Sequence, residues 1–318
     1  MRADADEPTQ RSTPPPDLPG LIPQLAIEAA AAPPVRVAST DGITVALHDL
    51  GGDGPALLLC HATGFCAGVW EPVMAHLPGW HGWAPDLRGH GDADAPTDHD
   101  YRWSGFAEDV LAIVDHLVRD GAATRPLVAA GHSKGGAALL LAELARPGTF
   151  AALWCYEPVV FPPGGAGTGA NPLAEGALRR RATFPSAAAA YANFASKPPL
   201  DIFAAEALAA YVRSGFAVAD DGSVMLKCPP AVESAVYRMG GQHDAFERLG
   251  EVRCPVTIAV GAETPFGPAA MAPSIAERLP AGVLEEHRDL GHFGPMQDPA
   301  RIAGSIDAAL RGAVTGHH

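Results

Sequence analysis

Short apolar runs recur along the chain, and longer segments with helical spacing separate them. Runs that are continuously apolar, rather than alternating, indicate strands buried on both faces, as in a parallel sheet covered by helices. The runs are ALLLC (56–60), GWAPD (82–86), PLVAAG (126–131), ALWCYE (152–157), VTIAVG (256–261) and VLEEH (283–287). The pattern therefore predicts an α/β fold with a mostly parallel sheet flanked by helices.

Other patterns predict the ends of the fold. Asp41-Gly42, a dipeptide suited to a tight turn, separates VRVAST from ITVALHDL and predicts a hairpin at the amino end of the sheet. Helical segments are expected at 67–77, at 106–120 and directly after Ser133. Near the carboxyl end, every fourth residue is apolar and predicts one amphipathic helix; these residues are Ile302, Ile306, Leu310 and Val314.

The rhythm of strands and helices is interrupted between the runs at 152–157 and 256–261. The interruption lasts roughly a hundred residues, which is too long for an ordinary connection in an α/β unit. Its composition favours helix, so we expect a helical cap at 161–248, inserted into an α/β core formed by 35–160 and 249–318. Residues 1–34 are rich in Pro, Ala and acidic side chains, and we expect an extension outside the core.

Composition argues against several classes of partner. The 318 residues carry a formal net charge of -14, which would repel nucleic-acid phosphates and anionic lipid surfaces. No uninterrupted apolar run approaches the about eighteen residues of a membrane span, and the amino terminus has no basic or apolar leader, so we expect a cytoplasmic protein. The five cysteines are scattered without C-x-x-C spacing. They predict reduced thiols in or near the core, rather than disulfides or a zinc site.

The stretch AGHSKGG, residues 130–136, places Ser133 between Gly131 and Gly135 where an apolar strand meets a helical run. This is the G-x-S-x-G pattern of a nucleophile on a sharp strand-to-helix turn. The turn is so tight that a Cβ at either glycine would collide with neighbouring backbone, and the serine itself is strained. The context favours Ser133 as a nucleophile.

These motifs and their order resemble the α/β-hydrolase family over roughly residues 35–315. HATGF (61–65) is similar to the family's oxyanion loop, and DLRGHG (86–91) is similar to its D-x-R-G-x-G turn. The turn around Ser133 is similar to the nucleophile elbow, and Gly291-His292-Phe293 stands where the family carries its catalytic histidine. HATGF is also similar to a bacterial branch of hydrolases without an assigned substrate.

A serine hydroxyl needs a base to take its proton as it attacks a carbonyl. The resemblance implies that His292 is this base, because it follows the last strand and precedes the final helix. His287 lies within the strand itself, so we expect it to be structural. No metal or organic cofactor is needed for this chemistry.

The acid that orients the histidine has two candidates. The usual family position, three residues past the glycine of VTIAVG, is Thr264, and Glu263 lies one step before it. A second family position is the end of the preceding strand, where Glu157 stands. Both candidates satisfy the chain order of serine, acid and histidine. Glu157 is favoured because a carboxylate at the end of a buried strand has little structural reason to be there, and Glu263 is the alternative.

The oxyanion hole is implied by the resemblance to consist of the backbone N–H groups of Thr63 and Lys134. We expect the Lys134 side chain to extend along apolar surface to solvent and to pair with a carboxylate; recognition of an acidic substrate group is the alternative. Arg179-Arg180-Arg181 is expected on a solvated helix face, with recognition of a carboxylate or phosphate as the alternative.

The remaining polar residues of the motifs have structural interpretations. Asp86 and Arg88 are expected to tie loops together, and His61 and His132 are expected to hydrogen-bond backbone near the site. The terminal GHH (316–318) is too short to indicate a metal site.

The sequence as a whole predicts a serine hydrolase that cleaves a small apolar carboxylic ester or lactone through an acyl-enzyme on Ser133. Amide hydrolysis, carbon–carbon cleavage and acyl transfer use the same parts, and a catalytically silent binding protein is the alternative outside enzymology. A serine at the elbow argues against epoxide hydrolase and dehalogenase chemistry, which need a carboxylate nucleophile. No oligomeric state follows from the sequence.

Overall fold

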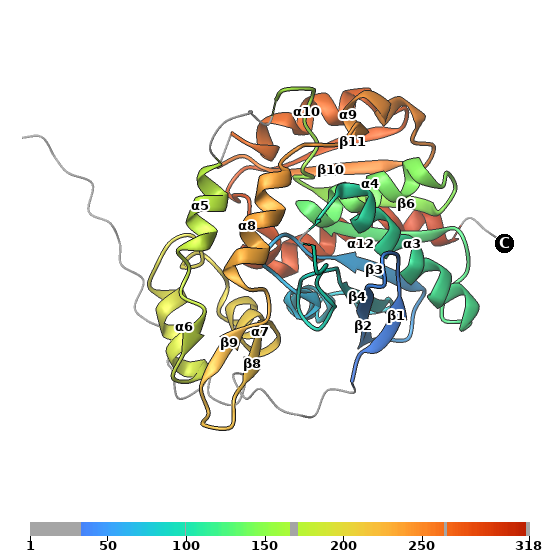
Figure 1. The fold of residues 1–318 in the computed structure, drawn as a ribbon. Coiled ribbons are helices and arrows are strands. Elements are labelled where there is room, and N and C mark those ends of the chain that lie inside the picture. Colours follow the sequence, from blue (N-terminus) through green and yellow to red (C-terminus); the bar gives the residue numbers. More distant parts are fainter. Residues whose placement is uncertain (1–32, 99, 166–170, 264–265, 316–318) are drawn as a thin grey trace, which may run out of the picture.

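The apolar runs form the strands of one eight-stranded sheet in the computed structural model, which describes residues 33–98, 100–165, 171–263 and 266–315 (Figure 1). The strands are β1 (Val35–Ala38), β2 (Thr44–Gly51), β3 (Ala56–Cys60), β4 (His81–Asp86), β5 (Leu127–His132), β6 (Phe150–Tyr156), β10 (Val256–Gly261) and β11 (Gly282–His287). Their order is β1-β2-β4-β3-β5-β6-β10-β11. Only the pairs β1–β2 and β2–β4 are antiparallel, so the predicted α/β class with a mostly parallel sheet is confirmed.

Helices cover both faces of this sheet and create two cores. One face carries α3 (Trp103–Arg119), α4 (Lys134–Ala145) and α10 (Pro268–Arg278), and the other carries α2 (Glu71–Met74) and α12 (Pro299–Thr315). In β5, Leu127 and Ala129 enter the first core, whereas Val128 and Ala130 enter the second. The continuous apolar runs therefore reflect burial on both faces. None of the helices in the described ranges is long and apolar enough to span a bilayer.

The expected hairpin and the expected final helix are both present. Asp41 and Gly42 have φ of 60° and 73°, the left-handed values of a tight turn between antiparallel strands. The apolar stripe of α12 packs on the sheet through Ile302, Ile306 and Leu310. The helix expected at 67–77 is instead a 3₁₀ turn, η2 (Ala67–Trp70), followed by the single turn of α2.

The long interruption forms a cap on one side of the sheet (Figure 1). Its elements are α5 (Pro172–Leu178), β7 (Thr183–Phe184), α6 (Ala187–Ala195), α7 (Ala205–Gly215), β8 (Phe216–Val218), β9 (Val224–Leu226) and α8 (Pro230–Met239). The cap is mainly helical, but it also holds a three-stranded antiparallel sheet in the order β7-β9-β8, which the sequence analysis missed. Strands of two or three residues are too short to show a periodicity.

Ion pairs join the cap to the core. Arg213 of α7 pairs with Glu71 of α2, and the Lys227 ammonium lies 2.8 Å from a carboxylate oxygen of Asp92. The chain then returns to the core through α9 (Ala245–Arg248) and η3 (Leu249–Glu251), where Phe246 joins the core that contains α4. The expected extension at 1–34 lies almost wholly outside the described residues, as does the terminal GHH.

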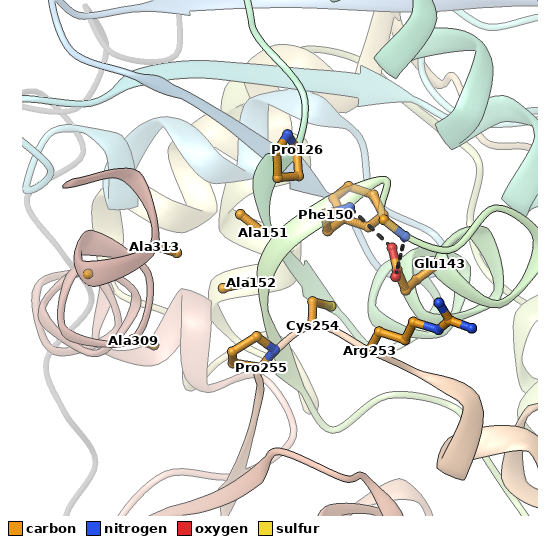
Figure 2. A pocket seen from close by; sticks show the side chains of 12 residues that line it. Pro126, Glu143, Phe150, Ala151, Ala152, Arg253, Cys254, Pro255, Ala309 and Ala313 are labelled. Carbon is orange, nitrogen blue, oxygen red and sulfur yellow. Dashed lines mark hydrogen bonds between the residues drawn. The ribbon is translucent and has the colours of Figure 1, made fainter. Parts of the chain in front are cut away.

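A cavity of about 530 Å³ opens at the amino ends of β5, β6 and β10, bounded by Pro126, Phe150 and Pro255 (Figure 2). The Glu143 carboxylate, which lines this cavity (Figure 2), accepts backbone hydrogen bonds from the amides of Gly148 at 2.8 Å and Phe150 at 3.1 Å. Parallel strands place the nucleophile turn at their carboxyl ends. This cavity therefore lies at the opposite edge of the sheet from Ser133.

The turn from β5 to α4 has no room for side chains at its glycines. A Cβ built on Gly131 would lie 2.7 Å from the carbonyl carbon of Gly135, and one built on Gly135 would lie 2.2 Å from the carbonyl oxygen of Cys60. Both distances are far below van der Waals contact with backbone atoms. The steric requirement expected of these glycines is therefore confirmed.

This geometry predicts that Gly135→Ala is strongly destabilising. The alanine would push α4 away from β3, so we expect the melting temperature to fall by about 5 °C or more. Gly304→Ala is the control, because Gly304 is exposed within α12 and its Cβ position is open. Alanine favours a helix by up to about 1 kcal/mol relative to glycine, so G304A should keep or raise the melting temperature. Equal melting temperatures for the two variants, measured by thermal unfolding, would contradict the packing described here.

Candidate active site

Ser133 occupies the strained residue of the turn between β5 and α4. Its φ of 53° and ψ of -112° lie outside the regions that L-residues ordinarily adopt. Backbone hydrogen bonds hold this conformation: the Ser133 amide donates to Tyr156 O at 2.9 Å, and Ser133 O accepts the amides of Ala137 at 3.1 Å and Val159 at 3.2 Å. Strain of this kind persists where the surroundings over-determine it, and it is concentrated at functional sites.

His292 and Glu157 form a hydrogen-bonded pair. His292 lies in the loop after β11, and its Nδ1 is 2.5 Å from Oε2 of Glu157. The second carboxylate oxygen of Glu157 accepts the Gly261 amide at 2.9 Å. Because Nδ1 donates to the carboxylate, the neutral imidazole has its free lone pair on Nε2, the nitrogen that can accept a proton.

Backbone strain also directs the Glu157 side chain. Glu157 follows β6 with a φ of 44°, and its side chain is only 1% exposed. A left-handed backbone is uncommon for glutamate. Together with the contact to the Gly261 amide, it fixes the carboxylate across the carboxyl end of β10.

The loop that carries His292 is bound to the turn that carries Ser133. His132 Nε2 donates to the His292 carbonyl at 2.7 Å, and the two imidazole rings lie 4.9 Å apart. Tyr156 donates its hydroxyl to Gly291 O at 2.8 Å, and the Gly291 amide donates to Gln297 at 2.8 Å. Tyr156 and Gln297 were not singled out from the sequence, because no motif marks such supporting contacts.

The other acid candidate, Glu263, forms no hydrogen bond or ion pair with His292 among the described residues. Glu263 is exposed, and its backbone amide donates to Leu290 O at 3.1 Å. Thr264, the residue at the usual family position, falls outside the described residues. Of the two glutamates, the structure places Glu157 in contact with the histidine.

The HATGF loop presents a free backbone donor. His61 Nδ1 donates to Ala62 O at 2.7 Å, and its Nε2 accepts the Leu87 amide at 3.2 Å, so one tautomer satisfies both bonds. Burial lowers the pKa of His61 well below its usual value. The Thr63 amide takes part in none of the hydrogen bonds found among the described residues. Lys134 is the first residue of α4, where amides lack an intrahelical acceptor.

The Lys134 side chain contradicts the expectation of a solvent-reaching lysine. It is fully buried, with Nζ 4.7 Å from the centre of the Phe106 ring and 3.3 Å from Nδ1 of His90. Across the described ranges, no carboxylate forms an ion pair with it. Burial lowers the pKa of the Lys134 ammonium from 10.5 to about 7, and the pKa values of His61 and His90 are also lowered by burial.

Arg180 does not lie on a solvated helix face as expected. Arg179 and Arg181 are exposed, but Arg180 forms an ion pair with Glu233 of α8. Its Nη2 also donates to the Tyr211 hydroxyl at 2.6 Å. The sequence could not distinguish the three adjacent arginines, because tertiary packing alone selects which one turns inward.

Asp86 and Arg88 tie loops together as expected. Asp86 accepts the amides of Ala67 at 2.7 Å and Asp92 at 2.8 Å. Arg88 is buried and donates to Asp109 through Nε at 2.9 Å and Nη2 at 2.8 Å. These bonds fix the DLRGHG turn to α3 and to η2.

One group within the described ranges has the spacing of metal ligands. Donor atoms of His48, Asp86 and Asp92 lie within 4.8 Å of one another. However, Asp86 already accepts two amides, and the Lys227 ammonium pairs with Asp92. A lysine supplies the positive charge at this group, so these residues fit a loop-fixing network better than a metal centre.

Aromatic rings from core and cap meet beside His292. The Phe293 ring centre lies 5.4 Å from that of His292 and 5.4 Å from that of Phe203 in the cap. Phe65 of the HATGF loop is 6.0 Å from Phe293 and 5.3 Å from Tyr211 of α7. The histidine therefore adjoins apolar surface contributed by both parts of the protein.

Curated proteins with similar sequences include several hydrolases. The chain is 37% identical over 113 residues to Lipase LipV of Mycobacterium tuberculosis, covering 35% of this chain and 40% of that protein. It is 33% identical over 103 residues to Probable protein phosphatase methylesterase 1 of Caenorhabditis elegans, covering 31% and 28%. An Epoxide hydrolase of Caballeronia sordidicola is 31% identical over 119 residues, covering 36% and 34%. The matches thus span less than half the length of each relative.

Solved structures share the fold over most of the chain. The peroxisomal alpha-beta-hydrolase Lpx1 of Saccharomyces cerevisiae superimposes with a TM-score of 0.73 at 19% identity, covering 92% of this chain and 88% of that one. The esterase RhEst1 of Rhodococcus sp. gives 0.67 at 22% identity, covering 90% and 100%. The model of the alpha/beta hydrolase family matches residues 57–305, from β3 into α12 and more than half of the chain. The chain therefore belongs to the alpha/beta hydrolase family.

Proposed function

We propose that this hydrolase cleaves carboxylic esters or lactones with Ser133 as its nucleophile. One observation carries the proposal: the buried Glu157 carboxylate accepts a hydrogen bond from Nδ1 of His292. The loop that contains His292 is in turn held by a hydrogen bond from His132, the residue before Ser133. A strained serine and an oriented imidazole at the same sheet edge support the proposal, although the hydrogen bonds found among the described residues do not include one between the Ser133 hydroxyl and His292.

In the proposed reaction, the Ser133 hydroxyl attacks the substrate carbonyl as Nε2 of His292 accepts its proton. The Glu157 carboxylate stabilises the imidazolium and maintains its orientation. The imidazolium then gives this proton to the departing alcohol, and the acyl group remains on Ser133. In the second half-reaction, His292 takes a proton from a water molecule as the water attacks the acyl carbonyl. The bond between the acyl carbon and Ser133 Oγ then breaks, the imidazolium returns the proton to that oxygen, and the acid is released.

The carbonyl oxygen becomes negative during both half-reactions, and the backbone amides of Thr63 and Lys134 are the proposed donors to it. Removing one such donor typically costs about 10² to 10³ in rate. The free Thr63 amide and the helix-start position of Lys134 support this assignment.

Apolar esters or lactones are the proposed substrates, because the Phe293 ring lies beside His292 and the rings of Phe65 and Phe203 pack against Phe293. Lipase and methylesterase relatives support ester hydrolysis. The epoxide hydrolase relative favours other chemistry, but epoxide opening of that kind needs a carboxylate nucleophile, and the elbow of this chain carries Ser133.

We predict that Ser133→Ala abolishes turnover of p-nitrophenyl butyrate and labelling by a fluorophosphonate probe, because no other group can form the acyl-enzyme. Ser274→Ala on α10 is the control and should retain both activities. Turnover is followed by p-nitrophenol release, and the adduct is located by peptide mass spectrometry. Retained turnover in S133A would exclude Ser133 as nucleophile. Wild-type protein that neither turns over nor becomes labelled would favour the silent binding protein.

Glu157→Gln should lower kcat by up to about 10⁴, because glutamine cannot stabilise the imidazolium or enforce the Nδ1–H tautomer. Glu263→Gln removes an equal charge from an exposed position and should keep kcat near that of the wild type. Steady-state kinetics on the same ester compares the two variants. A large loss in E263Q, or equal small losses in both, would overturn the assignment of Glu157.

Because the Lys134 ammonium is buried, we predict that the free energy of unfolding depends on pH. The pKa of Lys134 is about 7 in the folded protein and 10.5 ordinarily. Between pH 7 and pH 10.5 the unfolded chain therefore binds more protons than the folded protein. The free energy of unfolding of the wild type thus rises with pH over this range. Below pH about 7 the wild type bears the full cost of a buried ammonium. Lys134→Met removes that cost. The melting temperature of the variant minus that of the wild type should therefore be larger at pH 6 than at pH 9, by about 4 °C or more. A difference that is independent of pH would contradict the burial of a titrating ammonium.

A further inference from the structure

The cap packs directly on the HATGF loop. Gly64 has a φ of 80°, and a Cβ built on it would lie 2.7 Å from Oε1 of Glu233 and 3.3 Å from Nη1 of Arg180. Burial raises the pKa of the Cys228 thiol, which lies between β9 and α8, and the nearby Gly64 amide opposes this rise. The residue after Thr63 therefore lies beside cap residues at both its amide and its Cα.

The ion pair behind Gly64 is itself rigidly held. Arg180 donates to the Glu233 carboxylate through Nη1 and to the Tyr211 hydroxyl through Nη2. The Glu233 side chain is 6% exposed, and Tyr211 is fully buried. Burial disfavours a charged guanidinium, but neighbouring Tyr211 and Glu233 raise the pKa of Arg180, so the arginine stays charged. Tyr211 also packs edge-on against Phe65, with ring centres 5.3 Å apart.

Before Thr63, the core restrains the same loop through the two hydrogen bonds of His61. After Gly64, it does so through the packing of Phe65 on Phe293 and the bond from the Ala67 amide to Asp86. Thr63 lies between the hydrogen bonds of His61 and the cap contacts of Gly64. A shift of the ion pair would therefore move the Thr63 amide, and small displacements of a catalytic group are costly because the donor must point at the developing charge.

The charges matter as well as the contacts. The Glu233 carboxylate lies against the loop that faces the substrate oxygen as it becomes negative. Two negative charges in a poorly screened site repel each other, and an unpaired buried carboxylate is itself costly. The Arg180 guanidinium removes both penalties by neutralising Glu233.

We propose that Arg180 and Glu233 are positioning residues: their ion pair holds Gly64, and with it the Thr63 amide, in the geometry that stabilises the oxyanion. The proposal rests on the proposed function, because it assigns the cap a role in the same acyl transfer. Both proposed donors belong to the core, but the proposal makes their geometry depend on the cap, so correct docking of the cap is a condition for fast chemistry.

The test compares Arg180→Met, Glu233→Gln, the double variant R180M/E233Q and the wild type. Arg179→Met is the matched control, because it removes the same charge from the neighbouring exposed residue. Three quantities are measured: kcat/KM for p-nitrophenyl butyrate, the affinity of an alkyl trifluoromethyl ketone, and the affinity of the corresponding methyl ketone. The trifluoromethyl ketone forms a hemiketal whose oxyanion needs the hole, and the methyl ketone probes ground-state binding alone.

We expect R180M to lower kcat/KM and trifluoromethyl ketone affinity in parallel, by about 10- to 100-fold. The methyl ketone affinity of R180M and all three quantities for R179M should stay within about threefold of wild type. The double variant should recover kcat/KM by about threefold or more relative to R180M, because it removes the unpaired carboxylate. Unchanged kcat/KM in R180M, an equal loss of methyl ketone affinity, or no recovery in the double variant would overturn the proposal.

If R180M does not fold, R180M/E233Q and E233Q carry the test, since neither leaves a buried carboxylate unpaired. E233Q keeps the shape of the side chain that packs against Gly64. It should therefore bind the trifluoromethyl ketone more tightly than the double variant does. Equal affinities of the two variants would refute the positioning role. Failure of the proposed function is distinguishable, because the wild type would then acquire no fluorophosphonate adduct on Ser133. With a labelled wild type, unchanged ketone affinity in R180M removes only the role of the cap.

Discussion

The hydrogen bond between His292 and Glu157 is the interaction on which the candidate site depends. It joins residues that are 135 positions apart in the chain, and it spans the carboxyl ends of β6 and β11 across β10. The parallel sheet makes this possible because it delivers all three strand ends to one edge. The bond also selects a tautomer, and that choice leaves Nε2 as the basic nitrogen. The backbones of both partners are restrained. Glu157 has a left-handed φ, and the carbonyl of His292 accepts a hydrogen bond from His132.

Supporting contacts extend outward from this pair into both parts of the protein. Tyr156 and Gln297 hold the loop before His292, and the glycines around Ser133 bring α4 against β3. On the other side, the cap reaches the HATGF loop through Glu233 and Cys228. In this arrangement the sheet orients the groups proposed for proton transfer, and the cap packs on the loop proposed to stabilise the developing charge.

Much of the fold could be predicted because buried strands and helices show a recognisable pattern of apolar residues in the sequence. The strands of the large sheet are continuous apolar runs, and the final helix is one apolar stripe. The choice of Glu157 followed from a related argument, since a carboxylate that ends a buried strand needs a polar partner. The short strands of the cap could not be predicted in this way, because two or three residues are too few to show the alternation of a strand.

The side chains of Lys134 and Arg180 show where sequence reasoning stops. Long cationic side chains usually reach solvent, yet Lys134 is enclosed by Phe106 and His90, and Arg180 turns inward to Glu233. In both cases the deciding partners come from distant segments.

Ser133 is proposed to carry the acyl group during turnover, and rapid-quench mass spectrometry can detect that covalent intermediate. Wild-type protein is mixed with excess p-nitrophenyl butyrate, quenched in acid within milliseconds and digested. We expect a butyryl mass increment on the peptide that contains Ser133, formed no later than the first turnover of p-nitrophenol. Product release without that increment, or an increment on a different residue, would contradict this role of Ser133.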